Sequence, residues 1–166
     1  RYAGVNAIFD QNLCRNTIRY VDVVPPYDMG VEAIGEVVAI GDRVDGFRVG
    51  EAVTNVKLGA GYREYQIADV GKLIRVREAT PEILALMASG VSAMVALERI
   101  ADMKSGETVA VSAAAGGLGH FVVQLAKRAG NHVLALTGSD HKAALLRELG
   151  ADRVVNYRTE SLREVL

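Results

Sequence analysis

The chain has 166 residues, with 19 Lys and Arg against 20 Asp and Glu, so its formal net charge is −1. Half of the residues are hydrophobic and 23% are charged, a composition that excludes intrinsic disorder. The near-neutral balance provides no basic footprint for nucleic acid or for an anionic membrane. Seventeen glycines, three prolines and one cysteine exclude collagen-like, disulfide-framed and multi-cysteine zinc architectures.

The N-terminal residues contain no apolar core of a secretory signal. The most apolar region, residues 83–97, is interrupted by Ser89, Gly90 and Ser92 and is shorter than the roughly 20 residues that a membrane span needs. A single cysteine, Cys14, fits a reducing compartment. We therefore expect no membrane partner and a cytoplasmic protein. A peroxisomal or mitochondrial location is also compatible with the sequence, since targeting ends are not part of it.

The first half of the chain is typical of short β-strands separated by Gly, Asp and Pro. Strands are predicted at 32–40 and 51–56, and alternating apolar and polar residues predict another at 62–68. Spacing of this kind indicates a small irregular β-barrel. Residues 10–26, which include the pair Pro25-Pro26, are predicted to be loop.

Longer periods begin at Thr80-Pro81-Glu82, which has the cap, the proline and the first-turn acid of a helix start. One helix is predicted through Ala88 and a second over 92–103. The elements expected after them are strand 108–112, helix 119–129, strand 132–137, a helix ending at Leu149 that Ser139 or Asp140 caps, strand 154–157 and a helix opened by Thr159 or Ser161. Alternation of strands and helices predicts an open parallel sheet of the dinucleotide-binding type.

The most informative stretch is residues 113–119, which read AAAGGLG between a predicted strand and a predicted helix. Against the GxGxxG fingerprint the first glycine is replaced by Ala114, while Gly116 and Gly119 match. Gly116 or Gly117 lets the backbone approach a pyrophosphate, Gly119 lets the helix pack on its strand, and the helix N-terminus attracts the anion. The alternative is a tight turn without a ligand, but the βαβ context favours a dinucleotide.

The type of dinucleotide depends on the end of the second strand, where NAD sites carry Asp or Glu for the ribose hydroxyls. This sequence has Thr137-Gly138-Ser139 there, and Asp140 comes slightly late, so we interpret it as a helix cap. Lys142 is close enough to pair with a 2′-phosphate, although a lone lysine is usually only a solvated helix residue. NADPH is therefore predicted over NADH.

Together these residues resemble the medium-chain dehydrogenase/reductase superfamily, and within it the zinc-free branch of quinone oxidoreductases, enoyl reductases and prostaglandin reductases. The resemblance covers essentially the whole chain. It is carried, besides the glycine turn, by residues 4–7 (GVNA) with Asp10, 30–37 (GVEAIGEV), 49–53 (VGEAV), 62–65 (YREY), 89–93 (SGVSA), 149–152 (LGAD) and 155–157 (VNY).

The resemblance implies an α/β protein with two domains. Residues 1–80 would form a GroES-like β-barrel substrate domain that lacks its opening strands. Residues 81–166 would form the first half of an NADP-binding Rossmann domain, a doubly wound parallel sheet. The chain would then be a fragment of a longer protein, one that is usually a homodimer, and expressed alone it would bind NADPH weakly or not at all.

The same resemblance assigns site residues. The cofactor would be held by Gly116, Gly117, Leu118, Gly119, Gly138, Ser139, Lys142 and Tyr157. Asn6 would lie at the floor of the active-site cleft, and Ser92 would take the place of a threonine near the nicotinamide; no catalytic residue is identified. Tyr157 could instead be a strand residue with a solvated hydroxyl, and Asn6 could simply hydrogen-bond a turn.

Zinc-dependent alcohol dehydrogenases would have a cysteine at Asn6 and a histidine at Val31, and neither Asn nor Val supplies the ligand that zinc takes from those residues. No metal site is therefore expected. Chemistry without a Lewis acid favours conjugate reduction, in which NADPH delivers hydride to an α,β-unsaturated carbonyl or a quinone. A zinc-dependent alcohol dehydrogenase and a non-catalytic NADPH-binding sensor are the alternatives. Met94, where close relatives carry tyrosine, leaves the substrate open.

Overall fold

The computed structural model describes residues 26, 28–57 and 59–165. Contacts divide the chain into two compact units, Arg1–Ala88 and Ser89–Leu166, which are treated separately below. Asn6, Cys14 and residues 10–25 of the predicted loop lie outside the described residues. The division by contacts does not test the predicted domain boundary at 80/81, which stays a prediction.

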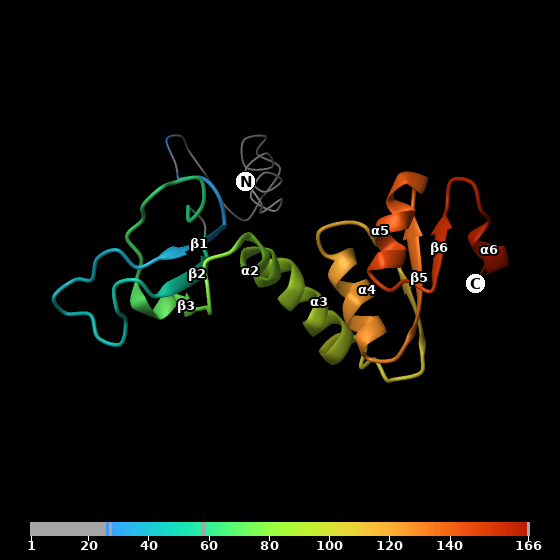
Figure 1. Cartoon of the computed structure of the whole chain (residues 1–166), viewed down its shortest axis with the longest axis horizontal. Helices are drawn as coiled ribbons and strands as arrows, with labels where there is room; N and C mark the ends of the chain where they lie inside the picture. The colour runs from blue at the N-terminus through green and yellow to red at the C-terminus, as the bar shows by residue number, and fades with distance from the viewer. Residues whose placement is uncertain (1–25, 27, 58, 166) are drawn as a thin grey trace. The chain divides into compact units, whose positions relative to one another are not determined.

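The described part of the first unit contains a three-stranded antiparallel sheet in the order β1-β2-β3, formed by β1 (Glu32–Glu36), β2 (Ala52–Val56) and β3 (Ile74–Arg75) (Figure 1). A 3₁₀ turn, η1 (Val70–Lys72), precedes β3. Buried Thr54 of β2 donates its hydroxyl to the Ala33 carbonyl of β1 at 2.7 Å, which ties the two longer strands together. The strand predicted at 32–40 is confirmed over its first five residues and ends four residues early, and the strand predicted at 51–56 is confirmed over residues 52–56.

The strand predicted at 62–68 is wrong, because the chain there forms no ladder with any described strand. Tyr62 has a φ of 53°, a left-handed conformation that interrupts an extended segment. Tyr65 and Ile67 are 73% and 102% exposed, so the alternating apolar residues do not face a core. Alternation predicts a strand only where a neighbouring strand can pair with it.

The helix predicted to begin after Thr80 is confirmed. The Thr80 hydroxyl accepts from the Ile83 N–H at 3.4 Å, and Pro81 occupies the first position of α2 (Pro81–Ala85). The predicted division into two helices is wrong, since one helical segment runs over Pro81–Ile100. It continues from α2 through the π-turn η2 (Leu86–Gly90), α3 (Val91–Val95) and the π-turn η3 (Ala96–Ile100).

Gly90 explains why the helical segment does not break. Its φ of −68° and ψ of −45° are helical, so the glycine weakens the helix without ending it. The segment is therefore a continuous 20 residues, contrary to the interruption expected from Ser89 and Gly90. By length and composition alone this segment could cross a membrane. Core helices of soluble proteins pass the same test, so this is only weak evidence for a membrane span.

Glu32 is a buried acid that joins β1 to this helical segment. Its Oε1 accepts from the Ala88 N–H at 3.0 Å, and Glu32 is only 4% exposed. Burial raises the pKa of Glu32, and the hydrogen bond from Ala88 opposes the rise only in part. The folded state therefore binds the proton more tightly than the unfolded state does.

We expect the free energy of unfolding to depend on pH through the Glu32 carboxyl. The stabilisation by protonated Glu32 is fully present below its unfolded pKa of 4.5 and is lost as the pH rises through the higher folded pKa. Glu32→Gln keeps an acceptor for Ala88 and removes the ionisation. We expect it to raise the free energy of unfolding at pH 7 by about 1 kcal/mol. Denaturant titrations at several pH values measure this; equal pH slopes for both proteins would contradict it.

The second unit is a parallel sheet in the order β4-β5-β6, built from β4 (Thr108–Val111), β5 (His132–Thr137) and β6 (Arg153–Asn156). The connections are α4 (Gly119–Arg128) and the pair η4 (Asp140–Lys142) and α5 (Ala143–Glu148). Both connections cover the same face of the sheet, as right-handed crossovers in one direction require (Figure 1). A short α6 (Leu162–Val165) follows.

The core of this unit lies between that face of the sheet and its helices. Fully buried Val133, Val123 and Leu146 supply its larger side chains, and the core cluster also includes Val111, Ala114, Ala126, Ala135 and Ala151. The predicted strand–helix–strand–helix–strand order is confirmed, with β5 at the predicted bounds. Of the two caps predicted for the third helix, Ser139 occupies the N-cap position of η4 but makes no side-chain cap bond. Asp140 does not cap the helix, because its carboxylate accepts from Asn156 instead.

Asp152, just before β6, completes the hydrogen bonding at the amino end of the sheet. Its Oδ2 accepts from the Val133 N–H at 2.8 Å, and its Oδ1 accepts from Lys127 Nζ at 2.6 Å. The hydrogen bond from Lys127, followed by that from Val133, lowers the pKa of Asp152. The Lys127 side chain is 43% exposed, so the bond to the buried Val133 matters more for stability.

Asp152→Ala is expected to lower the free energy of unfolding by about 1–3 kcal/mol, because the Val133 N–H loses its acceptor. Lys127→Met, which removes only the exposed ion pair, should cost less than about 1 kcal/mol. The wild-type advantage is present above pH 3.8, the unfolded pKa, and is lost as the pH falls through the lower folded pKa. Denaturant unfolding of the two variants measures the difference. Equal losses would show that the ion pair, not the backbone bond, carries the effect.

Candidate functional site

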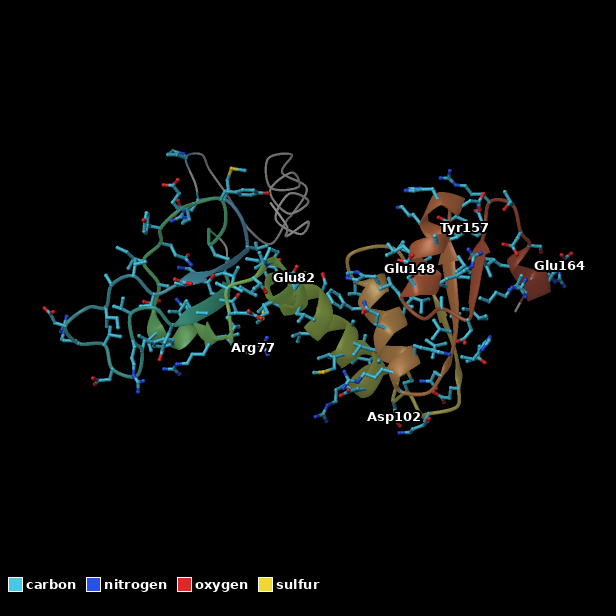
Figure 2. The ribbon with its side chains drawn as sticks, viewed as in Figure 1. Arg77, Glu82, Asp102, Glu148, Tyr157 and Glu164 are labelled. Carbon is cyan, nitrogen blue, oxygen red and sulfur yellow. The ribbon has the colours of Figure 1, made fainter. Side chains whose placement is uncertain are left out.

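The carboxyl edge of the parallel sheet gathers most of the residues predicted to hold a cofactor. Parallel strands end at the same edge, where ligands of open α/β sheets bind. The register pairs Thr137, the last residue of β5, with Asn156, the last residue of β6. The segments that follow them therefore start side by side. Tyr157 comes directly after β6 (Figure 2).

The turn between β4 and α4 depends on close backbone packing. A Cβ on Gly119 would lie 2.4 Å from the Ala113 carbonyl oxygen and 2.8 Å from Ala114 Cα, so only glycine fits there. A Cβ on Gly116 would lie 3.1 Å from the same oxygen. Ala113 has a φ of 47°, which is strained for a residue with a side chain. These glycines and this strain shape the turn itself.

Gly117 differs from Gly116 and Gly119 because no described residue comes close enough to require a glycine there. The nearest atom to a Cβ on Gly117 would be Ser89 Oγ at 3.8 Å, an ordinary contact. The N–H groups of Gly117 and Leu118 donate to no acceptor within the described part of the chain. No side chain caps α4, and its N-terminus adds a partial positive charge. The turn therefore presents open space and unused donors, which fits an anion such as a pyrophosphate.

A second cluster lies where β5 ends. A Cβ on Gly138 would lie 2.7 Å from Tyr157 Oη and 3.2 Å from Arg158 Nε, so both side chains lie over this glycine. Arg158 was not among the residues predicted from the sequence. Its signal was its place directly after Tyr157, at the carboxyl end of the strand that pairs with β5. The structure thus adds a guanidinium group to the predicted cluster.

Two cations are candidates to bind an anion at this strand end: Arg158, over Gly138, and Lys142, in the turn that follows β5. Neither Lys142, in exposed η4, nor Arg158 takes part in an ion pair with any described residue. The nearby acids are engaged elsewhere, since Asp140 accepts from Asn156 at 2.7 Å and Glu160 lies 3.6 Å from Arg153. Ser139 Oγ lies 2.9 Å from His141 Nδ1. The arrangement suits an anionic group near Gly138.

Ser92 lies one helical turn after Ser89, whose hydroxyl faces Gly117, and residues three apart share a helix face. The proposed place of Ser92 near the cofactor stays a prediction. Asn6, the predicted floor of the cleft, is not among the described residues. Within residues 26, 28–57 and 59–165, no group of three or more His, Cys, Asp or Glu side chains could hold a metal ion.

The first unit contains a hollow of about 1470 Å³, and its described lining residues include none of those predicted for the site. Apolar side chains make up much of its lining, among them Val38, Ile40, Phe47, Tyr65, Ile67 and Leu73. It is formed by the sheet of that unit and the segments around it.

Comparison with known families gives two matches. Residues 1–78 match the family described as the alcohol dehydrogenase GroES-like domain, and residues 117–166 match the family described as zinc-binding dehydrogenase. The order is that of a barrel-type domain followed by a nucleotide-binding sheet. The chain belongs to the medium-chain dehydrogenase/reductase superfamily. The predicted fold class, a GroES-like domain followed by a Rossmann-type parallel sheet, is confirmed.

Relatives in this superfamily are similar along the whole chain. Prostaglandin reductase-3 of Mus musculus is 40% identical over 168 residues, which cover 100% of this chain and 44% of that protein. A "Probable quinone oxidoreductase" of Leishmania amazonensis is 40% identical over 163 residues, which cover 98% of this chain and 47% of that protein. The chain thus spans less than half the length of these relatives. The likeness predicted to the quinone oxidoreductase and prostaglandin reductase branch is confirmed.

Solved structures of the superfamily show the same fold. The Escherichia coli quinone oxidoreductase complexed with NADPH matches with a TM-score of 0.82 and 27% identity, over 96% of this chain and 49% of that one. That relative holds NADPH. This likeness supports a nicotinamide cofactor for the present chain.

Proposed function

We propose that this chain belongs to an NADPH-dependent, zinc-independent reductase of the C=C bond of α,β-unsaturated carbonyls or of quinones. The observation that carries the proposal is the end of β5, where Lys142 and Arg158 form no ion pair with any described residue and no strand-terminal acid is present. An NAD site would carry an acid there for the ribose hydroxyls, whereas two cations and a tyrosine favour a 2′-phosphate.

The residues present fit a dinucleotide. Gly117 leaves space at the turn, and the N–H groups of Gly117 and Leu118 are available to the pyrophosphate. Gly138 lets Tyr157 and Arg158 lie over the end of β5, where they would bind the 2′-phosphate together with Lys142 and Ser139. The α4 N-terminus adds its dipole to the pyrophosphate site.

When bound, the nicotinamide supplies the hydride for reduction. The residues of this chain bind and orient that cofactor: the glycine turn fixes the pyrophosphate, the β5 and β6 ends fix the adenosine end, and Ser92 would lie near the nicotinamide. The strained Ala113 and the packed Gly119 hold the turn rigid before the cofactor arrives, so little ordering is needed on binding.

Zinc independence is supported by residue chemistry. Val31 cannot ligate zinc, and Asn6 does not provide the thiolate expected of a catalytic zinc site. The names of the relatives, a prostaglandin reductase and quinone oxidoreductases, support a carbonyl-conjugated or quinone substrate. The family description of residues 117–166 as a zinc-binding dehydrogenase keeps the zinc-dependent alternative open to test.

The test is oxidation of NADPH by the full-length protein with a panel of enones and quinones, with and without a chelator, alongside metal analysis. We expect turnover that persists after chelation and NADPH used in preference to NADH. Turnover lost on chelation together with stoichiometric zinc would favour a zinc-dependent alcohol dehydrogenase. Tight NADPH binding without turnover on any carbonyl would favour a sensor protein.

A further inference from the structure

Asn156 is a buried polar residue at the junction of the two strand ends. It is 7% exposed and is the last residue of β6. Its side-chain amide donates to Asp140 Oδ1 at 2.7 Å, and its side-chain oxygen accepts from the Arg158 N–H at 3.1 Å. The amide therefore contacts both the segment after β5 and the segment after β6.

The main chain of Asn156 is fixed as firmly as its side chain. Its N–H donates to Glu160 Oε1 at 3.0 Å, and its carbonyl accepts from the Glu160 N–H at 2.8 Å and the Thr159 N–H at 3.0 Å. A buried amide with every one of these bonds in place has little freedom to turn. Asp140 is thus held by a rigid partner.

Asp140 is the only carboxylate in residues 137–142, the segment that would face the adenosine ribose. A free carboxylate there could accept hydrogen bonds from the ribose hydroxyls of NADH, and its charge would repel a 2′-phosphate. A charge-assisted hydrogen bond of 2.7 Å to Asn156 occupies one of its oxygens and fixes its position against β6.

We propose that Asn156 is a positioning residue that selects NADPH over NADH by holding the Asp140 carboxylate against β6. The inference rests on the proposed function, since it assigns the cofactor preference of the same site. Asn156 touches no cofactor atom in this scheme and acts only through Asp140. The cations Lys142 and Arg158 would attract the 2′-phosphate. Asn156 would keep the Asp140 carboxylate, which repels that phosphate, away from it.

The experiment is a double-mutant cycle on the full-length protein, with the dissociation constants of NADPH and NADH measured by fluorescence titration. Asn156→Ala is expected to lower the ratio of the NADH constant to the NADPH constant about tenfold, the effect of one charge-assisted hydrogen bond. Asp140→Ala should keep the wild-type ratio. In Asn156→Ala with Asp140→Ala the ratio should return to the wild-type value, because the released carboxylate is gone.

Two controls separate positioning from stability. Asn131→Ala removes another buried amide, at the opposite end of β5, and should leave the ratio unchanged. Asn156→Ser keeps a short polar group near the Arg158 N–H but cannot reach Asp140, and serves if the alanine variant does not fold. A ratio unchanged in Asn156→Ala or Asn156→Ser, or not restored by Asp140→Ala, would overturn the inference. Wild-type protein that binds neither dinucleotide would instead refute the proposed function.

Discussion

Gly117→Val is expected to abolish useful binding of NADPH while leaving the fold intact. The Cβ position of Gly117 meets nothing closer than Ser89 Oγ at 3.8 Å, so the protein itself tolerates a side chain there. The cofactor does not, because the pyrophosphate must approach the backbone of the turn closely. We expect the dissociation constant to rise about 100-fold, or about 2.8 kcal/mol, with a smaller rise for Gly117→Ala.

Gly119→Ala is the matched variant with the opposite outcome. Its Cβ would meet backbone atoms of Ala113 and Ala114, which cannot move aside, so the free energy of unfolding should fall by about 1–3 kcal/mol. Thermal unfolding and fluorescence titration of both variants measure the contrast. Unchanged NADPH affinity in a folded Gly117→Val protein would show that the pyrophosphate does not lie at this turn.

Removal of both cations at the end of β5 is expected to eliminate the preference for NADPH. In the proposed site each would form a charge-assisted contact with the 2′-phosphate that NADH lacks. In the double variant Lys142→Met with Arg158→Met, the NADPH dissociation constant should rise about 100-fold, at roughly 1.4 kcal/mol for each lost contact. The NADH constant should change less than about twofold, since its ribose carries no phosphate.

The specificity of this effect is checked with a third cation. Arg153 opens β6 at the opposite end of the strand and lies 3.6 Å from Glu160. Arg153→Met removes the same charge from the same unit and should leave both constants unchanged. A loss of NADPH affinity in Arg153→Met equal to that of a single Lys142 or Arg158 variant would mean that overall charge, not a local site, attracts the dinucleotide.

The parallel sheet could be predicted from the sequence because its strands are short and rich in apolar residues and have glycines close to their ends. Gly119 and Gly130 delimit α4 closely, and β5 has the predicted bounds. Two helices were predicted for the segment from Pro81 because glycine usually weakens or ends a helix. Gly90 is nevertheless helical, and its conformation is fixed by neighbouring residues rather than by its own preference. Residues 62–68 have the alternation of a strand, but no described strand pairs with them, and pairing is a long-range property.

The parts of the candidate site that belong to a recognisable sequence motif could be predicted from the sequence. The glycine turn and Lys142 follow from local sequence, and Tyr157 follows from the resemblance to the family. The part of all of them in binding stays a prediction. Arg158 directly follows Tyr157 in the sequence, but its place over Gly138 depends on the pairing of β5 with β6, which local sequence does not give. The same pairing explains Asp140, which local rules predict as a cap but which bonds to Asn156 from sixteen residues away.

The most direct measurement is calorimetric titration of the full-length protein with two adenosine fragments, 2′,5′-ADP and 5′-AMP, which differ only by the 2′-phosphate. The cluster of Lys142, Tyr157 and Arg158 predicts that 2′,5′-ADP binds at least about tenfold tighter, and that salt weakens this advantage. Equal affinity for the two fragments would contradict an NADPH site at the carboxyl edge of β5 and β6.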